Sequence, residues 1–517
     1  MVQDARKTAL RWMLVGAVLC LAIAPVLPLV ISTLSQTTST PVWTRAFSDS
    51  LLSSLWLGIG VSLLSLLIGL PLGLLVALYR FPGRSTLGLF QALPLLLPSF
   101  LPCIGWSNLA AAEWLTWFPS PDGFSGCVFV LGLQAVPLPF FATWAACQNL
   151  TASQIEAARL HGGEKTVLKL SARACAPVAI LAALLGGILS LSDPGAPLIF
   201  GYRSVAIEIR TSFSSALHDP ELAGRQCLLL AGVVLFLTTP LLIFGLRSLA
   251  SAVLARQTRP AVPYAHPVMR RLAMTGLVSF LIVAVVLPTM GLCLPAANNP
   301  MFGRAGQKIA DTAWTTLMFT GGGGAIAVVL ATMVALATAN HPRLRLTALA
   351  VLLALLAMPP ALAAIGVIRV ATHAAAQLDW LMRSELTVAM VLGLRFFPVA
   401  TLAMMRAVGS LSPSWTDAAR VHGVAPSRLL VRVVLPLLTP AIIVSLLLVM
   451  VLSAADITTT HLLQPPGQRS LPVAIFTVMA NSPEGYVASL CLLYLLSVVA
   501  LLTATSQLPR LWARSAA

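Results

Sequence analysis

The sequence SQIEAARLHG at residues 153–162 returns as SWTDAARVHG at residues 414–423, 261 positions later. Around both copies the chain is almost entirely apolar. A polar stretch kept at the same place in two halves indicates a tandem duplication in which this segment has a role of its own. In a membrane protein the simplest such role is a docking surface. Two docking surfaces imply a partner with two-fold symmetry.

Composition places the chain in a membrane. Hydrophobic residues make up 58% of its 517 residues and charged residues only 9%, whereas about a quarter of an ordinary soluble domain is charged. Apolar runs of about 20 residues recur, each long enough to cross the roughly 30 Å hydrocarbon layer as a helix. Strands of a membrane barrel alternate in polarity, but Leu63–Leu78 is apolar throughout. We predict an all-α polytopic membrane protein.

The apolar runs predict about twelve transmembrane helices, six in each half. The predicted spans lie near residues 12–34, 51–78, 87–112, 124–147, 175–200, 227–246, 272–295, 312–338, 345–371, 386–405, 436–455 and 486–507. The third contains Pro94, Pro98 and Pro102, and the ninth contains Pro359 and Pro360. Proline removes a backbone donor and clashes with the preceding turn, so we predict that both are kinked or broken.

The basic residues predict the orientation of the chain. The first apolar run resembles a signal peptide, but Pro25 follows its Ala-Ile-Ala stretch directly, which argues for a retained helix. With a cytoplasmic N-terminus, about 22 of the 32 Lys and Arg residues fall in cytoplasmic segments, as the positive-inside rule requires. The C-terminus is then cytoplasmic as well. The net charge of +16 therefore reflects topology. The basic residues are scattered over short loops, which argues against nucleic-acid binding.

The duplication defines the expected domains. Residues 1–250 form the first repeat, 251–271 a cytoplasmic linker and 272–517 the second repeat. An even number of spans per half makes the repeats parallel, so the polar loops at 150–174 and 411–435 both face the cytoplasm. Other matched pairs keep the same order along the chain, among them Ser192-Asp193 with Ala455-Asp456.

Each polar loop reads as a short helix, a glycine turn and a second helix. Ser153 with Glu156, and Ser414 with Asp417, have the spacing of a capping box. Gly162 and Gly423 then end the helix, since glycine adopts positive φ at low cost.

The small residues suggest how a partner contacts each loop. Ala157-Ala158 and Ala418-Ala419 would allow a partner surface to approach each short helix closely. We call each helix-glycine-helix unit an elbow and predict that it docks a partner. The alternative is an amphipathic loop lying on lipid headgroups, which does not explain two matched copies.

The loops resemble the EAA motif of inner-membrane components of binding-protein-dependent ABC importers. That motif is Glu-Ala-Ala, then Gly, then an Ile-x-Leu-Pro ending. The second copy fits through Asp417-Ala418-Ala419, Gly423, Val433 and Leu435-Pro436. The first has Glu156-Ala157-Ala158 and Gly162 but carries Cys175 where proline would be.

The resemblance implies the fold of a type I importer permease and a set of coupling residues. In that family the elbow is a coupling helix that docks on the ATP-hydrolysing subunit. The implied ATPase-coupling residues are Glu156, Ala157, Ala158, Arg159, Gly162, Asp417, Ala418, Ala419, Arg420 and Gly423.

The resemblance also implies partners, a location and a substrate. Two elbows per chain imply two ATPase copies, and a substrate-binding protein would deliver the solute outside an inner membrane. The fused layout is similar to the double permeases of ferric-iron, thiamine and similar small-solute uptake systems, with iron favoured over thiamine, polyamines or phosphonates. The outer segments near 201–225 and 456–485 could meet the delivering protein.

The chain itself does not have the motif of an ATPase. No G-x-x-x-x-G-K-[ST] sequence is present, and Gly321–Gly324 lies inside an apolar run, where it is better interpreted as close helix packing. We therefore expect a non-catalytic subunit without a cofactor. Eight cysteines without a C-x-x-C pair indicate neither a metal site nor a disulfide framework.

Charges at membrane depth are the remaining candidates. Asp193 and Asp456 occupy matching positions near the outer ends of the fifth and eleventh spans. They either line a translocation path or begin outer loops. For Arg369 and Arg395 we expect pairing or snorkelling rather than substrate contact.

One alternative from another class is an ion-gradient-driven secondary transporter with two six-helix halves. Such carriers are expected to place a polar signature after the second span, where Tyr79–Thr86 and Asn340–Leu346 are short and unremarkable.

Overall fold

The computed structural model describes residues 2–35, 42–112, 121–214, 219–254, 264–373, 380 and 384–515. Within these ranges all regular secondary structure is helical, and one isolated bridge pairs Tyr79 with Tyr264. The described part contains ten helices long and apolar enough to cross a membrane, or up to twelve if each of two bent pairs is one span. The all-α polytopic prediction is confirmed. Helices satisfy every backbone group internally, which hydrocarbon demands.

The first half runs from α1 to α12. Its helices are α1 (Val2–Ile23), α2 (Leu27–Ser35), α3 (Arg45–Leu78), α4 (Arg84–Phe90), α5 (Leu93–Leu96), α6 (Phe100–Ala110), α7 (Gly123–Ala135), α8 (Pro137–Cys147), α9 (Ala152–Ser190), α10 (Gly195–Ile199), α11 (Val205–Ser214) and α12 (Pro220–Leu254). The predicted fifth span extended to residue 200, which is wrong because α9 ends at Ser190 and α10 is a separate short helix.

The second half runs from α13 to α25. Its helices are α13 (Pro267–Leu281), α14 (Leu287–Asn298), α15 (Phe302–Thr338), α16 (Pro342–Ala357), α17 (Pro360–His373), α19 (Glu385–Ser410), α20 (Pro413–Val421), α21 (Pro426–Leu429), α22 (Leu435–Ala455), α23 (Ile457–Leu463), α24 (Leu471–Val478) and α25 (Glu484–Ser515). π-Helical turns at Ile282–Val286 and Leu430–Val434 join α13 to α14 and α21 to α22.

The third and ninth spans are broken, as predicted. Residues 84–96 and 100–110 meet at 91°, and residues 342–357 and 360–371 meet at 85°. At each break a residue before proline is forced out of the helical region. Leu97 has ψ 141° and Met358 has ψ 142°. The two breaks lie 261 residues apart, so the duplication extends to backbone geometry.

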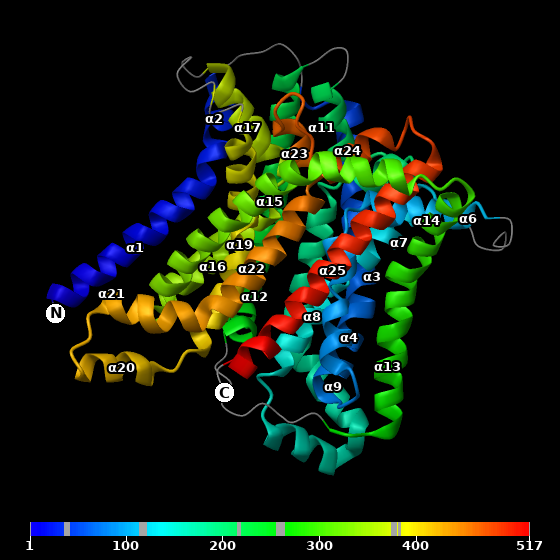
Figure 1. Ribbon diagram of the computed structural model, residues 1–517. Coiled ribbons are helices and arrows are strands. Elements are labelled where there is room, and N and C mark those ends of the chain that lie inside the picture. Colours follow the sequence, from blue (N-terminus) through cyan, green and yellow to red (C-terminus); the bar gives the residue numbers. More distant parts are fainter. Residues whose placement is uncertain are drawn as a thin grey trace.

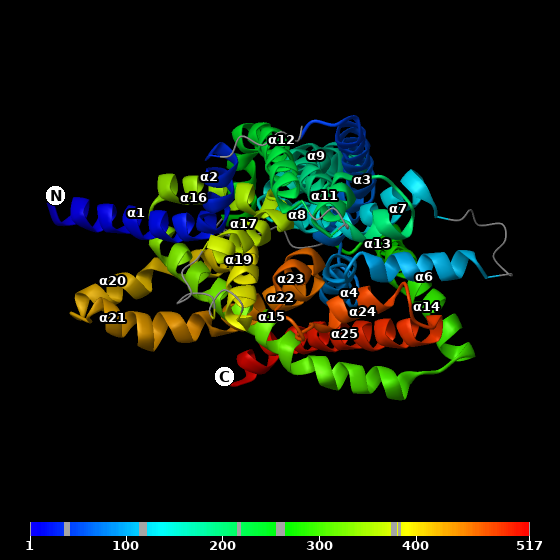
Figure 2. The same ribbon diagram turned by 90° about the horizontal axis from the view of Figure 1, so that it is seen from above.

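The two sequence repeats are interlaced in space. α1 packs on α15, α16 and α19 of the second half, while α13 and α14 pack on α3 and α6 of the first. Figure 2 shows α1 beside α16 at one side and α14 beside α6 at the other. One core cluster accordingly combines Val15 and Val18 with Phe319 and Phe397. The predicted repeats at residues 1–250 and 272–517 therefore pack helices against each other.

Close helix contacts in each half depend on glycine. A Cβ at Gly187 of α9 would lie 2.3 Å from the carbonyl oxygen of Gly58 on α3. In the second half a Cβ at Gly393 of α19 would lie 2.8 Å from the carbonyl oxygen of Gly323 on α15. The interpretation of Gly321–Gly324 as a packing element is thus confirmed at Gly323. Small residues of this kind let membrane helices approach closely.

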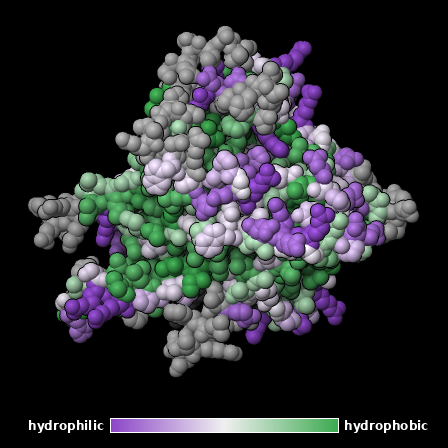
Figure 3. Space-filling model, turned by 45° about the horizontal axis from the view of Figure 1, so that its top comes forward, coloured by the Kyte–Doolittle hydropathy of each residue, from purple (hydrophilic) through white to green (hydrophobic). Residues whose placement is uncertain are grey.

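Both elbows lie at the same end of the bundle. The start of α9 and helix α20 lie in the lower part of Figure 1, as do both chain ends, whereas α11, α23 and α24 lie at the opposite end. Figure 3 shows a broad hydrophobic face, with hydrophilic side chains gathered at one lower corner and over the end turned forward. This arrangement fits parallel repeats whose polar loops share one side of a membrane.

Candidate docking elbows and central cavity

The first elbow begins at a capping box built on Thr151. The Thr151 hydroxyl accepts from the amide of Gln154 at 3.4 Å, and the Gln154 side chain accepts from the amide of Thr151 at 3.1 Å. This arrangement satisfies two free amides at the start of α9. The prediction that Ser153 and Glu156 form the cap is wrong by two residues.

The second elbow begins at the matching position. Helix α20 starts at Pro413, and the hydroxyl of Ser412 accepts from the amide of Ser414 at 3.4 Å. Ser412 lies 261 residues after Thr151. The predicted cap at Ser414 is therefore also wrong by two residues, and both elbows start at equivalent points.

The glycine turn of the first elbow uses Gly163. Gly162 has φ −161° and ψ 22°, whereas Gly163 has φ 64° and ψ −159°. The prediction of positive φ at Gly162 is wrong, because Gly162 has an extended φ that any residue can adopt. Gly163 occupies a region that is nearly exclusive to glycine.

The second elbow turns at Gly423, as predicted. Gly423 has φ 64°, and the amide of Val424 donates to the carbonyl oxygen of Ala419 at 2.9 Å. That six-residue bond is typical of a Schellman helix end. Pro426 then starts α21, at the first helical position that proline tolerates.

The two elbows present equivalent side chains outward and inward. Leu160 is 90% exposed and its equivalent Val421 is 83% exposed. Ala158 and Ala419 are both only 8% exposed. The expectation that both alanines of each pair face a partner is therefore wrong for the second alanine, which faces the bundle.

The exposed side of each elbow also carries the first alanine of its pair. Ala157 and Glu156 are exposed on the first elbow, and Ala418 and Asp417 are exposed on the second. The side chain of Arg420 lies outside the described residues. Each elbow therefore exposes a carboxylate, a small residue and a large aliphatic residue at matching positions.

The first elbow is anchored by a polar network. Arg159 Nε lies 2.7 Å from Glu164 Oε1, and Tyr79 Oη donates to Glu164 Oε2 at 2.6 Å. The Arg159 guanidinium also lies 4.0 Å from the ring centroid of Tyr264, which follows the inter-repeat segment. Burial and the Glu164 carboxylate hold the pKa of Tyr79 above its usual range. Arg159, predicted as a coupling residue, is thus engaged inside the chain.

A cavity of about 520 Å³ lies between the halves and is lined by both candidate aspartates. Asp193 Oδ1 accepts from Ser99 Oγ at 2.8 Å and from the amide of Gly195 at 2.7 Å. Asp456 Oδ2 lies 2.6 Å from Arg395 Nε, and Asp456 Oδ1 accepts from the amide of Thr459 at 3.1 Å. Each aspartate therefore both accepts hydrogen bonds from the backbone of the short segment that follows it and lines the cavity.

The two arginines are paired, as expected. Arg395 pairs with Asp456, and Arg369 Nη1 lies 3.5 Å from Glu221 Oε1. Charges in low-dielectric surroundings are tolerated when they are paired in this way.

Two further cavities adjoin the central one. On the side of the termini, a cavity of about 570 Å³ shares Leu138, Phe141, Leu356 and Val399 with it. Its lining includes Gln148 and Arg406 from opposite halves, and Arg406 Nη2 donates to Gln148 Oε1 at 2.6 Å. This cross-half bond marks a polar rim at the end of the bundle that carries the elbows.

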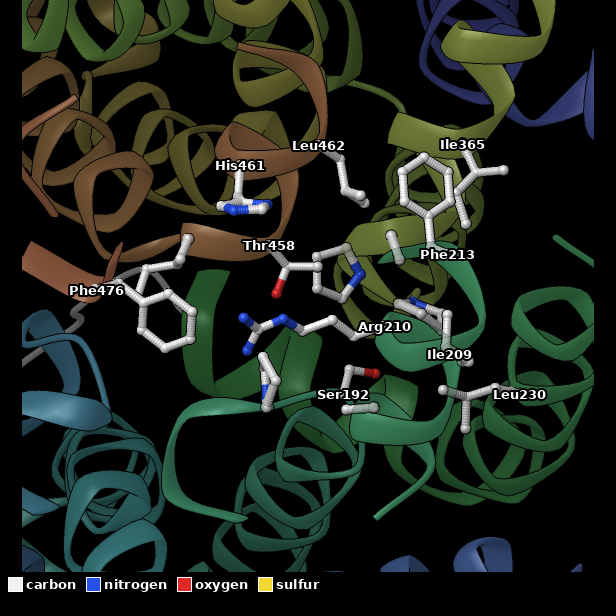
Figure 4. A pocket seen from close by; sticks show the side chains of 16 residues that line it. Ser192, Ile209, Arg210, Phe213, Leu230, Ile365, Thr458, His461, Leu462 and Phe476 are labelled. Carbon is white, nitrogen blue, oxygen red and sulfur yellow. The ribbon is translucent and has the colours of Figure 1, made fainter. Parts of the chain in front are cut away.

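A much smaller cavity lies at the other end. It shares Ser192, Pro194, Thr458 and Phe476 with the central cavity. Figure 4 shows the guanidinium of Arg210 directed towards Phe476, below His461, and Arg210 Cζ lies 4.8 Å from the ring centroid of Phe476. Burial and the charges of Arg210 and Arg469 lower the pKa of His461. The end of the bundle opposite the elbows is thus a narrow, mostly apolar constriction.

Fold and geometry together define a polytopic helical membrane protein with a path of cavities between two halves. Residues 327–512 match a family model described as "Binding-protein-dependent transport system inner membrane component". The matched stretch contains the second elbow, Arg395 and Asp456. Comparison with curated proteins and with solved structures gives no match.

Sequence reasoning missed Gln134, Ser99 and the pair Leu160 and Val421. Leu131-Gly132-Leu133-Gln134 aligns with Leu392-Gly393-Leu394-Arg395 at the same offset of 261. That alignment was the available signal for Gln134. No pattern in the sequence predicts that Ser99, in a broken span, would contact Asp193 after the fifth.

Proposed function

We propose that the chain is the permease subunit of an ATP-driven ABC importer. In this proposal the two elbows dock two copies of a separate ATPase, and a solute delivered by an extracytoplasmic binding protein passes between the two halves. The chain supplies no ATP hydrolysis of its own. The family match over residues 327–512 supports this class.

The observation that carries the proposal is the equivalence of the two elbows. They are capped at matching residues, carry Leu160 and Val421 almost fully exposed, and lie at the same end of the bundle. A large aliphatic side chain exposed to this extent on a polar loop has no packing role within the chain. Two such side chains at equivalent positions fit a partner that binds twice.

We further propose a role for each elbow residue. Leu160 and Val421 enter apolar pockets on the ATPases, since buried aliphatic or aromatic anchors usually carry docking energy. Glu156, Ala157, Asp417 and Ala418 surround these anchors. Gly163 and Gly423 hold the turns, while Ala158 and Ala419 seat each elbow on the bundle. Asp193 and Asp456 lie on the translocation path. The protein lies in an inner membrane, and both of its chain ends face the cytoplasm.

Co-purification tests the proposal. The tagged full chain, co-expressed with its ATPase subunit, should carry two ATPase copies when the intact complex is analysed in detergent by native mass spectrometry. Leu160→Asp alone and Val421→Asp alone should each shift the population towards one bound copy, and the double variant should retain far less ATPase than the parent. Full retention of two copies by the double variant would refute docking at the elbows.

The secondary-transporter alternative is separated by reconstitution. Liposomes containing the chain with its ATPase should take up solute only with ATP and binding protein. Uptake by the chain alone, driven by a proton or sodium gradient, would favour the alternative. The preference for ferric iron as the solute rests on resemblance alone. The residues that line the central cavity favour a different kind of solute.

A further inference from the structure

The charged residues of the central cavity are distributed unequally between the two halves, because one residue differs at equivalent positions. At equivalent positions on α7 and α19, Gln134 and Arg395 each donate a hydrogen bond to the carbonyl oxygen at a helix break. Gln134 donates to Leu97, and Arg395 donates to Met358. The same contact is therefore built twice, once with a neutral side chain and once with a cation.

Only the second half uses this position to neutralise its aspartate. Arg395 reaches beyond Met358 to Asp456, whose side chain is 5% exposed. Gln134 has no charge to offer Asp193. Within the described residues no Lys, Arg or His nitrogen lies within 4.0 Å of the Asp193 carboxylate, whose hydrogen bonds come from Ser99 and the following backbone.

A second observation points to a ligand at the same place. The hydroxyl of Ser192, next to Asp193, is buried and has no hydrogen-bond partner among the described residues. Ser192 lines both the central cavity and the outer constriction (Figure 4). A buried hydroxyl without a partner is costly unless a ligand or water engages it. Ser192 and Asp193 thus form a polar corner in a cavity lined mainly by aliphatic residues and by Phe141, Phe396 and Phe476.

The charge of the lining limits what binds there. Two carboxyl side chains, Asp193 and Asp456, and one cation, Arg395, line the cavity, and because Arg395 pairs with Asp456, Asp193 is left without a cationic partner within 4.0 Å among the described residues. The lining includes no His or Cys. A bare multivalent metal ion prefers several charged or donor ligands, whereas one carboxylate beside a hydroxyl and aromatic faces suits a singly charged organic cation.

We propose that the central cavity binds a singly charged organic cation, with Asp193 as its counter-ion and Ser192 as a hydrogen-bond partner. Gln134 sets this selectivity by remaining neutral where the second half has arginine. The transport role of the site rests on the proposed function, but its charge preference does not. The proposal replaces ferric iron with an amine or a quaternary ammonium solute that has an apolar body.

The charge preference can be measured without a known substrate. Val399 lines both the central cavity and the adjoining cavity of about 570 Å³, so Val399→Cys places a thiol where these two cavities meet. The purified full chain is treated separately with a trimethylammonium-ethyl and a sulfonatoethyl methanethiosulfonate reagent. The chain without the added cysteine supplies the background, and a small free thiol supplies the intrinsic rate ratio. We expect the cationic reagent to be favoured at least about tenfold above that ratio, because clefts of one charge concentrate counter-ions.

Three variants assign the preference to its residues. Asp193→Asn should return the ratio to that of the free thiol, and Gln134→Arg, which copies the second half, should do the same. Gln134→Met is the matched control, since it changes the side chain without adding charge and should keep the preference. A neutral methanethiosulfonate should label all variants at similar rates, which verifies an intact cavity. An absent preference, or one that survives both Asp193→Asn and Gln134→Arg, would overturn the proposal.

Protection distinguishes an organic cation from a metal ion. Benzyltrimethylammonium should slow labelling of Val399→Cys in the parent and not in Gln134→Arg. Protection by ferric citrate in its place would refute the organic class. These measurements need neither ATP nor an ATPase. Failure of ATPase docking would therefore refute only the proposed function, and absence of labelling selectivity would refute only this inference.

Discussion

The two elbows share their caps, glycine turns and exposed side chains but differ in how they are held. Both are capped at equivalent residues, turn at a glycine with positive φ and expose one aliphatic side chain. The first is tied to the bundle through Arg159, Glu164 and Tyr79. Asn340 and Ala425 occupy the positions of Tyr79 and Glu164 in the second half and cannot form that network. We therefore assign the features present in both elbows to the proposed docking, and the features present in one elbow to its anchoring on the bundle.

The difference has a structural origin. The first elbow lies beside Tyr264, at the end of the segment that joins the repeats, and a single chain has only one such segment. Within the described residues α20 makes no extensive packing with another helix. We therefore expect the second elbow to open more readily than the first.

The largest effect is expected at the glycine turns. Gly163→Val and Gly423→Val should each weaken ATPase binding about tenfold or more, because a β-branched residue at positive φ costs on the order of 1–3 kcal/mol. Binding of the ATPase to the detergent-solubilised chain measures the loss. Gly409→Ala, in a helix with open space around it, serves as the control. Equal binding by the valine variants and the control would contradict the role of the turns.

A smaller effect is expected at the exposed aliphatic pair. Leu160→Asp and Val421→Asp should each reduce ATPase affinity at their own elbow about tenfold, the scale of losing one buried anchor. Leu160→Met keeps an apolar side chain and should bind nearly as well as the parent. Titration of the ATPase against each variant gives the affinities. A loss at only one elbow would show that the two docking surfaces are not equivalent.

Removal of the tyrosine hydroxyl should affect one elbow only. Tyr79→Phe deletes a hydrogen bond to a carboxylate, worth about 1.5–3 kcal/mol. Amide hydrogen exchange should accelerate roughly tenfold in residues 152–163 and remain unchanged in residues 413–421. Tyr202→Phe, which removes a hydroxyl bonded to Ser53 at 2.9 Å, should leave both elbows unchanged. Faster exchange in both elbows after Tyr79→Phe would remove the distinction between anchored and unanchored copies.

The smallest effect is expected at the helix caps and should be symmetric. Thr151→Ala and Ser412→Ala each remove a capping hydroxyl, which costs about 1 kcal/mol. Hydrogen exchange in the first turn of α9 and of α20 should therefore rise by a similar factor. A large effect of Ser153→Ala or Ser414→Ala instead would restore the cap positions predicted from the sequence.

Much of this molecule followed from sequence alone, because membranes restrict structure strongly. Long apolar runs had to become helices. The prolines that follow Leu97 and Met358 had to break two of these helices, and the repeated polar segment marked both elbows. Local details were less certain. Threonine and serine compete as caps at neighbouring positions, and either glycine of Gly162-Gly163 could have taken the positive φ.

Tertiary structure decided which distant residues meet. The exchange of α1 and α13 between halves, the anchoring of Arg159 on Tyr264, and the meeting of Asp193 with Ser99 join segments that no local pattern connects. Sequence could place Asp193 and Asp456 at equivalent positions. Only packing determined that Arg395 neutralises one and that Gln134, at the equivalent position, leaves the other uncompensated, because charge pairing depends on distances of a few ångströms across the bundle.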